Sequence, residues 1–166
     1  MASRASVTKW RVSRLFTSHN GYPASKDPAE IGIKSYLIKG TDRKMRVAEK
    51  VAPLLCGFAA DFHDLIEPID EGTFDDWAYA FRDVRGGTAL SNHASGTAID
   101  LNATLHPLGE SDTFTPEQVK IIRLLCKKYG LKWGGVFVHR KDEMHFEVSL
   151  TPAKAAALVK RLGVNK

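Results

Sequence analysis

The sequence predicts an α+β fold in which helices flank a small, mostly antiparallel sheet. The chain of 166 residues is 43% hydrophobic and 26% charged, a composition typical of a globular domain. Segments with helical periodicity and segments with strand periodicity both occur, but they do not alternate as βαβ units. Because neither an internal repeat nor a low-complexity linker divides the chain, we expect one domain over residues 1–166.

The N-terminal third begins with a polar segment that is rich in turn residues. Residues 1–30 are expected to form an arm or loop, which packs late or borders the site. Residues 33–38 are predicted to form a short strand that ends before Gly40. Apolar residues then recur at three-and-four spacing over residues 44–66, which predicts an amphipathic helix. Pro53 lies inside this segment and marks either a kink or the true start of the helix.

The middle of the chain is predicted to contain strands and a long loop. Strand-like segments cover residues 65–69 and 77–82, with a turn between them. Residues 82–109 are rich in Gly, Ser and Asn, which favours a loop. Within this loop the alternating run of residues 97–102 predicts a strand.

The C-terminal third carries clear helix signals. The segment Thr115-Pro116-Glu117-Gln118 predicts a helix start, with Thr as the N-cap and Gln three residues later, and Gly130 predicts its end. Residues 136–138 and 144–150 are expected to form two paired strands. A last helix is predicted to open with Thr151-Pro152 and to end before Gly163.

Charge and cysteine usage narrow the possible classes of protein. The net charge of +5 and the isoelectric point near 9.2 favour polyanions, either nucleic acid or anionic cell-wall polymers. The basic residues are spread along the chain without a nucleic-acid-binding motif, so we expect solvated faces and no nucleic-acid partner. Cys56 and Cys126 lie in apolar helical patterns and are expected to be buried free thiols.

The chain also lacks recognisable export and membrane signals. The N-terminus has no apolar region of the length that a secretory signal needs, and no segment has the apolar length of a membrane span. We therefore expect a protein that is made in the cytoplasm and reaches any external target by a separate route. A monomer is the default expectation for its oligomeric state.

Two short segments contain the residues that point to metal chemistry. His93 and Asp100 lie seven positions apart, and Gly96 between them permits a sharp bend from a loop into a strand. His145 lies in the second segment, where strand alternation would put His145 and Glu147 on one face. Two imidazoles and one carboxylate are a common ligand set for catalytic zinc, which leaves a fourth position for water. We therefore predict one catalytic Zn²⁺ ion.

Hydrolysis at such an ion also needs a base that takes a proton from the attacking water. Two carboxylates lie just before His145 in the sequence, Asp142 and Glu143. Alternation favours Glu143, whereas a turn at residues 141–142 would bring Asp142 over the metal. The spacing alone leaves both alternatives open.

These segments resemble the zinc D,D-/L,D-peptidases, a family that includes D-alanyl-D-alanine carboxypeptidases, D-Ala-D-Ala dipeptidases and phage endolysins. The family pattern S-x-H-x-x-G-x-A-x-D is matched at every fixed position from Ser91 to Asp100. The second pattern, an acidic residue three before a histidine that is followed by Phe, is matched from Asp142 to Phe146. The resemblance extends through Trp133-Gly134-Gly135 and covers roughly residues 33–150.

The resemblance implies a role for each of these residues. His93, Asp100 and His145 would hold the zinc ion, and Asp142 rather than Glu143 would be the general base. An upstream arginine would steady the developing oxyanion. Arg82 fits this role better than Arg85, because the pair Phe81-Arg82 matches the family more closely.

Two further implications concern the surroundings of the metal and the fold. Ser91 would orient His93 or bind substrate. Many relatives have an acidic residue after Trp-Gly-Gly, whereas this chain has Val136, so no supporting role is expected there. The implied fold is a hedgehog/D-Ala-D-Ala peptidase-like α+β fold.

The implied activity is hydrolysis of a stem-peptide bond in peptidoglycan. An endolysin-like endopeptidase that cuts between L-Ala and D-Glu is the leading hypothesis, and it would reach the wall through a separate membrane pore during phage lysis. A D-alanyl-D-alanine carboxypeptidase with the same zinc site is the rival within this chemistry. A catalytically inactive wall-binding module is the alternative from another class. Under the endolysin-like hypothesis, the basic surface would help to hold the enzyme on the anionic polymers of the cell wall.

Overall fold

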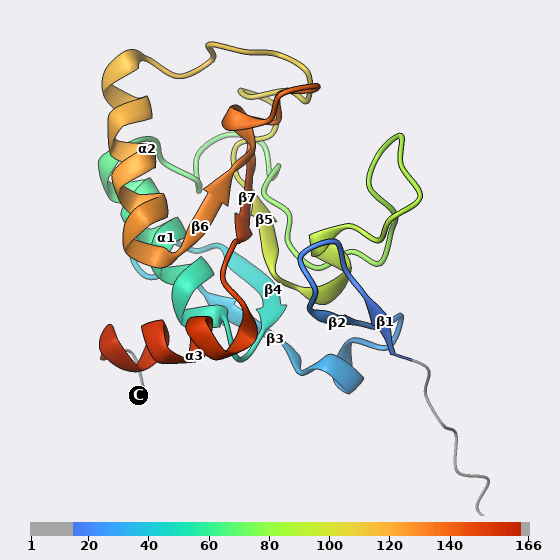
Figure 1. The fold of residues 1–166 in the computed structure, drawn as a ribbon. Helices are drawn as coiled ribbons and strands as arrows, with labels where there is room; N and C mark the ends of the chain where they lie inside the picture. Colours follow the sequence, from blue (N-terminus) through green and yellow to red (C-terminus); the bar gives the residue numbers. More distant parts are fainter. Residues whose placement is uncertain (1–14, 164–166) are drawn as a thin grey trace, which may run out of the picture.

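The computed structural model describes residues 15–163, and Figure 1 shows its layers. A three-stranded antiparallel sheet with the order β5-β7-β6 lies at the centre. Its strands are β5 (Ala98–Asp100), β6 (Leu131–Trp133) and β7 (His145–Val148). The predicted α+β class with a small antiparallel sheet is confirmed.

Three helices accompany this sheet in the described part of the chain. They are α1 (Ala52–Leu65), α2 (Pro116–Tyr129) and α3 (Pro152–Arg161). In Figure 1, α1 and α2 cover one side of the sheet, whereas the loop of residues 82–90 extends on the opposite side. The sheet therefore has one face in the core and one face toward a loop-lined region.

Two antiparallel hairpins precede the central sheet. The first pairs β1 (Phe16–Thr17) with β2 (Pro23–Ala24), and the second pairs β3 (Ile33–Leu37) with β4 (Lys44–Ala48). Strand β3 confirms the prediction for residues 33–38. The expected arm of residues 1–30 falls partly outside the described residues, and its described part forms the β1–β2 hairpin and a short 3-10 helix, Pro28–Ile31.

The helix predicted over residues 44–66 is wrong in its first part. Residues 44–48 form β4, in which Met45 and Val47 are buried while Lys44 and Arg46 are exposed. The apolar residues of this short segment fit a period of two as well as a helical period, and pairing with β3 decides between them. Pro53 marks the true helix start, since it lies in the first turn of α1.

Three predicted strands also differ from the structure. Leu65 ends α1, and residues 66–69 are not a strand. Residues 77–82 are extended but pair with the sheet only through a bridge between Trp77 and Asp100. The partner of β7 is β6 rather than residues 136–138, because Gly134–Val136 forms a 3-10 turn and leaves Val138 88% exposed.

The helix signals in the C-terminal third are confirmed. Thr115 and Gln118 form a reciprocal capping box at the start of α2, and Gly130 ends this helix with a left-handed backbone conformation. Thr151 caps α3, which begins at Pro152. Each of these ends satisfies backbone groups that a helix would otherwise leave unpaired.

Aromatic packing joins the sheet to α1. The ring of Phe146 in β7 lies 4.5 Å from the ring of Phe58 and 5.8 Å from the ring of Phe62, measured between centroids. All three side chains are fully buried, and each contributes about 1.5–3 kcal/mol relative to an exposed side chain. Phe146 therefore fixes the position of its neighbour in the chain, His145.

The cysteines fit the prediction of free thiols. Cys56 in α1 is half-buried and Cys126 in α2 is buried, and neither forms a disulfide within residues 15–163. Burial raises the pKa of each thiol to about 12. Among the described helices, none combines the length and apolar character that a membrane crossing needs.

Candidate metal centre

The register of the central sheet brings Asp100 and His145 together. Asp100 in β5 and His145 in β7 are directly opposed in the antiparallel ladder. Side chains of opposed residues stand on the same face with their Cβ atoms roughly 5 Å apart. Phe146 and Val148 point into the core, and His145 and Glu147 point to the other face, as strand alternation predicts.

A tight turn delivers His93 to the same point. His93 lies in the 3-10 helix Asn92–Ser95, and the hydroxyl of Ser91 accepts a hydrogen bond from its backbone N–H at 3.3 Å. Ser91 thus caps the turn that carries His93. Nδ1 of His93 lies 2.6 Å from the carbonyl oxygen of Ala78, so Nδ1 donates to this carbonyl and Nε2 faces the sheet.

Gly96 ends this turn, and two features exclude any larger residue there. Its φ of 65° lies in the left-handed region. A Cβ at this position would lie 2.2 Å from Cδ1 of Ile33 and 2.8 Å from the backbone nitrogen of Ala48. The glycine of the first motif therefore lets the loop pack directly against β4 before the chain enters β5.

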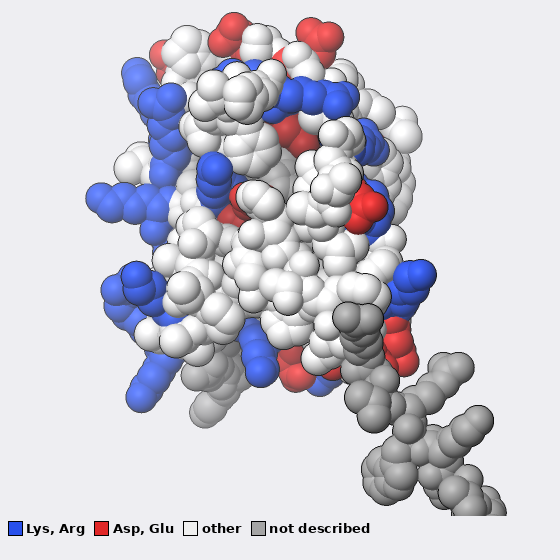
Figure 2. Space-filling model, turned by 45° about the vertical axis from the view of Figure 1, so that its right-hand side comes forward, with Lys and Arg blue, Asp and Glu red and all other residues white. Residues whose placement is uncertain are grey.

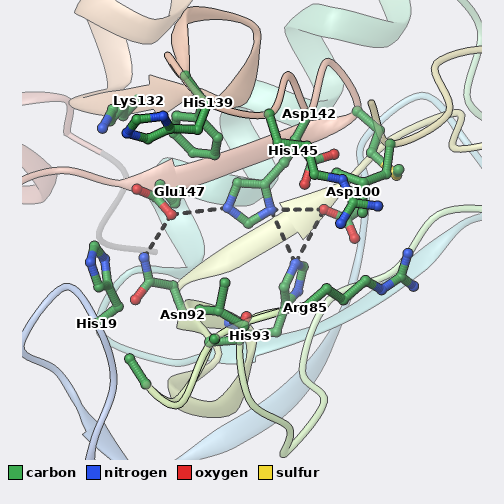
Figure 3. Close-up of a pocket in the computed structure, with 18 of the residues that line it drawn as sticks. His19, Arg85, Asn92, His93, Asp100, Lys132, His139, Asp142, His145 and Glu147 are labelled. Atoms are coloured by element: carbon green, nitrogen blue, oxygen red, sulfur yellow. Dashed lines mark hydrogen bonds and ion pairs between the residues drawn. The ribbon is translucent and has the colours of Figure 1, made fainter. Parts of the chain in front are cut away.

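The three predicted ligands form a compact, buried cluster. Nε2 of His93 lies 3.1 Å from Oδ1 of Asp100 and 3.2 Å from Nδ1 of His145, and Nδ1 of His145 lies 2.9 Å from Oδ1 of Asp100. Figure 3 shows these side chains pointing toward one another, and all three line one cleft. One ligand atom from each residue lies within 4.8 Å of the others, so the cluster could hold a metal ion.

The charge balance of this cluster favours a cation. Burial alone would raise the pKa of Asp100, but the His93 and His145 rings outweigh it and hold that pKa well below its usual range. Burial alone would lower the pKa of His145, whereas its contacts with Asp100 and Glu147 raise it to about 10. The buried carboxylate thus attracts positive charge, which a protonated imidazole or a metal cation can supply.

Asp142 lies beside the cluster and has an unused acceptor. It lines the same cleft, and its Oδ1 is buried without a hydrogen-bond partner among the described residues. Burial raises the pKa of this carboxyl, which the nearby His145 ring partly offsets. A buried carboxylate oxygen without a donor is costly, so this atom fits a hydrogen bond to a ligand or water in the cleft.

Glu143 points elsewhere, contrary to the alternation argument. Its carboxylate accepts hydrogen bonds from the backbone N–H groups of Asp112 and Thr113, at 3.0 and 2.9 Å, and from the Thr113 hydroxyl. Alternation fails here because residues 141–144 precede β7, and a turn closed by the hydrogen bond from the backbone N–H of His145 to the carbonyl of Asp142 leads into the strand. Of the two candidate bases, the structure brings only Asp142 into the cleft.

The glycines of Trp133-Gly134-Gly135 allow Asp142 to reach this position. A Cβ on Gly134 would lie 2.2 Å from the backbone oxygen of Asp142. A Cβ on Gly135 would lie 2.2 Å from the Trp133 ring. The Trp133 indole N–H in turn donates to the carbonyl of Glu143 at 2.7 Å. This motif is therefore a packing surface for the segment that carries the acidic residue.

A cleft of about 680 Å³ opens above the cluster. Arg82 and Arg85 line it from one loop, and Val136, His139 and Lys132 line it from the region around β6. Figure 2 shows Lys and Arg side chains around recessed acidic groups on this face. Both candidate arginines therefore reach the cleft, as does Val136.

Sequence reasoning missed the groups that hold the histidines in place. The carbonyl of Ala78 carries no side-chain signal, and Asn92 was hidden inside the first motif as a variable position. His106 is also fully buried, but it is hydrogen-bonded to Glu67 and Thr113 outside this cleft and does not join the cluster. Glu147 was placed correctly on the face of His145, but its contact with that ring was not foreseen.

The comparisons with known proteins agree with the motifs. Residues 85–148 match the family model described as D-alanyl-D-alanine carboxypeptidase. No curated protein and no solved structure showed a significant match to the chain. The matched segment contains His93, Asp100, Asp142 and His145, which form or border the cluster. The resemblance to the D-alanyl-D-alanine carboxypeptidase family of zinc peptidases is thereby confirmed over residues 85–148.

Proposed function

We propose that this chain is a zinc-dependent peptidase that hydrolyses the L-Ala–D-Glu bond in the stem peptide of peptidoglycan. The convergence of His93, Asp100 and His145 at the base of an open cleft is the observation that carries this proposal. The family match supports peptide hydrolysis as the reaction class. The distribution of charge in the cleft supports cleavage of an internal bond, and the resemblance to endolysin-type peptidases suggests the L-Ala–D-Glu bond.

The three clustered residues would be the protein ligands of the ion. Two nitrogens and one carboxylate oxygen form a donor set that zinc prefers, and three protein ligands are usual for a catalytic site. A bound zinc ion supplies Lewis acidity for the attacking water and for the scissile carbonyl. The side chains His93 and His145 are held by Ala78 and Glu147, so their ligand nitrogens are oriented before binding.

Asp142 would act as the general base. Asp142 lines the cleft beside the cluster, and its carboxylate, whose Oδ1 has no hydrogen-bond partner among the described residues, can accept a proton from the attacking water. The same carboxyl can then donate this proton to the leaving amine. Glu143 has no free oxygen for this task, because both of its oxygens accept hydrogen bonds from residues 112–113.

Arg85 is the better candidate for stabilising the oxyanion. Both arginines line the cleft, but the positive charge of Arg85 acts on Asp142 and helps to offset the rise in its pKa. Arg82 instead donates to the adjacent backbone carbonyl of Asp83 at 3.4 Å. A cation near the general base is also near the scissile carbonyl, where it stabilises developing negative charge. We therefore favour Arg85 over Arg82, although the motif comparison favoured Arg82.

The distribution of charge favours an endopeptidase over a carboxypeptidase. Arg85 lies on one side of the cluster, and Lys132 and His139 lie on the other (Figure 3). A site for a terminal carboxylate needs a cation at one closed end, whereas cations on both sides suit an anionic peptide that continues past the cut. The positive net charge of +5 also favours attachment to an anionic wall.

Replacement of the base should separate catalysis from metal binding. We expect Asp142→Asn to lower kcat/KM on stem peptides by about 100-fold or more, because general-base catalysis contributes on that scale. Zinc stoichiometry should not change, since the three proposed ligands remain. Glu143→Gln is the neighbouring control. Activity that survives Asp142→Asn but is lost in a folded Glu143→Gln variant would show that the wrong carboxylate has been assigned.

A pair of arginine variants tests the oxyanion partner. Arg85→Ala should lower kcat by about 100-fold, the scale seen when one oxyanion donor is removed. Arg82→Ala should have a much smaller effect, because its guanidinium is directed to a backbone carbonyl. Steady-state kinetics on one defined stem peptide would measure both. The reverse order of the two effects would return the role to Arg82.

The bond specificity can be determined from the products. Digestion of purified sacculi should expose new D-Glu N-termini and lower the turbidity, and a chelator should stop both changes until zinc is added back. Mass spectrometry of the released muropeptides identifies the cut. Release of free D-Ala without new N-termini would establish the carboxypeptidase alternative. Binding to sacculi without any release would establish an inactive wall-binding module.

A further inference from the structure

A chain of hydrogen bonds leads from the proposed ligand His145 to the N-terminal hairpin. Oε2 of Glu147 lies 3.0 Å from Nε2 of His145, on the side of the ring away from Asp100. The same oxygen accepts a hydrogen bond of 2.6 Å from the side-chain amide of Asn92. Figure 3 shows these three side chains in a row beside the cluster.

The row continues into the turn between β1 and β2. The backbone N–H of Asn20 donates to Oδ1 of Asn92 at 2.8 Å. The side-chain amide of Asn20 donates to the hydroxyl of Thr97 at 2.8 Å and to the carbonyl of Val148 at 3.0 Å. The hairpin turn is thus bound to β7 and to the residue that precedes β5, and it holds Asn92 by a hydrogen bond.

This arrangement selects one tautomer of His145. Nδ1 of His145 faces Asp100 and His93, so it is the nitrogen whose lone pair a metal would use. The ring proton must then be on Nε2, and it needs an acceptor there. The Glu147 carboxylate can only accept, and Asn92 donates to it without competing for the proton. Because Glu147 accepts the Nε2 proton, Nδ1 is the nitrogen that a metal would use, in place of its contact with Asp100.

We propose that Glu147 is a positioning residue for the zinc ligand His145, and that Asn92 and the turn at Asn20 hold Glu147 in place. The inference rests on the proposed function, because it assumes that the cluster binds zinc. It gives the N-terminal hairpin a part in the metal centre, where the sequence indicated an arm or loop that packs late or borders the site.

The chain offers a matched control for a purely structural role. Glu67 and His106 form a second carboxylate–imidazole pair, with Oε2 2.9 Å from Nε2; the side chain of His106 is 1% exposed and that of Glu67 20% exposed. Neither residue lines the cleft that contains the cluster. Removal of Glu67 should therefore affect folding stability but leave the zinc affinity unchanged.

The test measures zinc affinity of the full chain by competition with a chromophoric chelator. Glu147→Ala and Asn92→Ala should raise the zinc dissociation constant by about 10- to 100-fold, the usual effect of removing a group that orients a ligand. Glu147→Gln keeps an acceptor for the His145 proton, so its loss should be less than about tenfold. Glu67→Ala should bind zinc as the unchanged chain does. Thermal unfolding of the metal-free variants separates loss of affinity from loss of fold.

The possible outcomes are distinct. Unchanged zinc affinity in folded Glu147→Ala would overturn the inference, and so would an equal loss in Glu67→Ala. If Glu147→Ala does not fold, Asn92→Ala decides by the same criterion, since it leaves the carboxylate in place. If the unchanged chain itself binds no zinc, the proposed function fails together with the inference. If it binds zinc and cuts stem peptides while all variants match it, only the inference fails.

Discussion

The antiparallel register of β5 against β7 determines the geometry of the candidate site. It sets Asp100 opposite His145, and a slip of one residue would turn one of these side chains into the core. Packing of Phe146 against Phe58 and Phe62 holds this register from the opposite face. The hydrophobic core and the polar cluster are therefore two faces of the same strand, and the first sets the position of the second.

Electrostatics explains why the cluster needs a cation. A carboxylate as buried as Asp100 is unfavourable unless positive charge or donors surround it. The two imidazoles supply this positive charge when one of them is protonated. A divalent ion would supply it instead and would displace the proton. Asp142 adds a further buried oxygen that has no donor among residues 15–163, close to the same point. The buried carboxylates of Asp100 and Asp142 thus favour a cation and a water molecule at this site.

Local signals in the sequence predicted much of this structure, and tertiary contacts account for the rest. Signals that act over a few residues could be recognised in the sequence. They are the cap residues Thr115 and Thr151 and the spacing from His93 to Asp100. The segment 44–48 fits two periodicities, and only its partner strand β3 selects between them. The contact of His93 with the Ala78 carbonyl joins residues 15 positions apart and involves no side chain of Ala78, so no motif could reveal it.

The central claim, that three side chains brought together by strand register bind one ion, can be tested directly by anomalous diffraction. Crystals of the chain grown with zinc would be measured on both sides of the zinc absorption edge. The account predicts one strong peak within bonding distance of Nε2 of His93, Oδ1 of Asp100 and Nδ1 of His145. A fully occupied zinc peak bound by other residues, with this cluster still closed by its own hydrogen bonds, would contradict it.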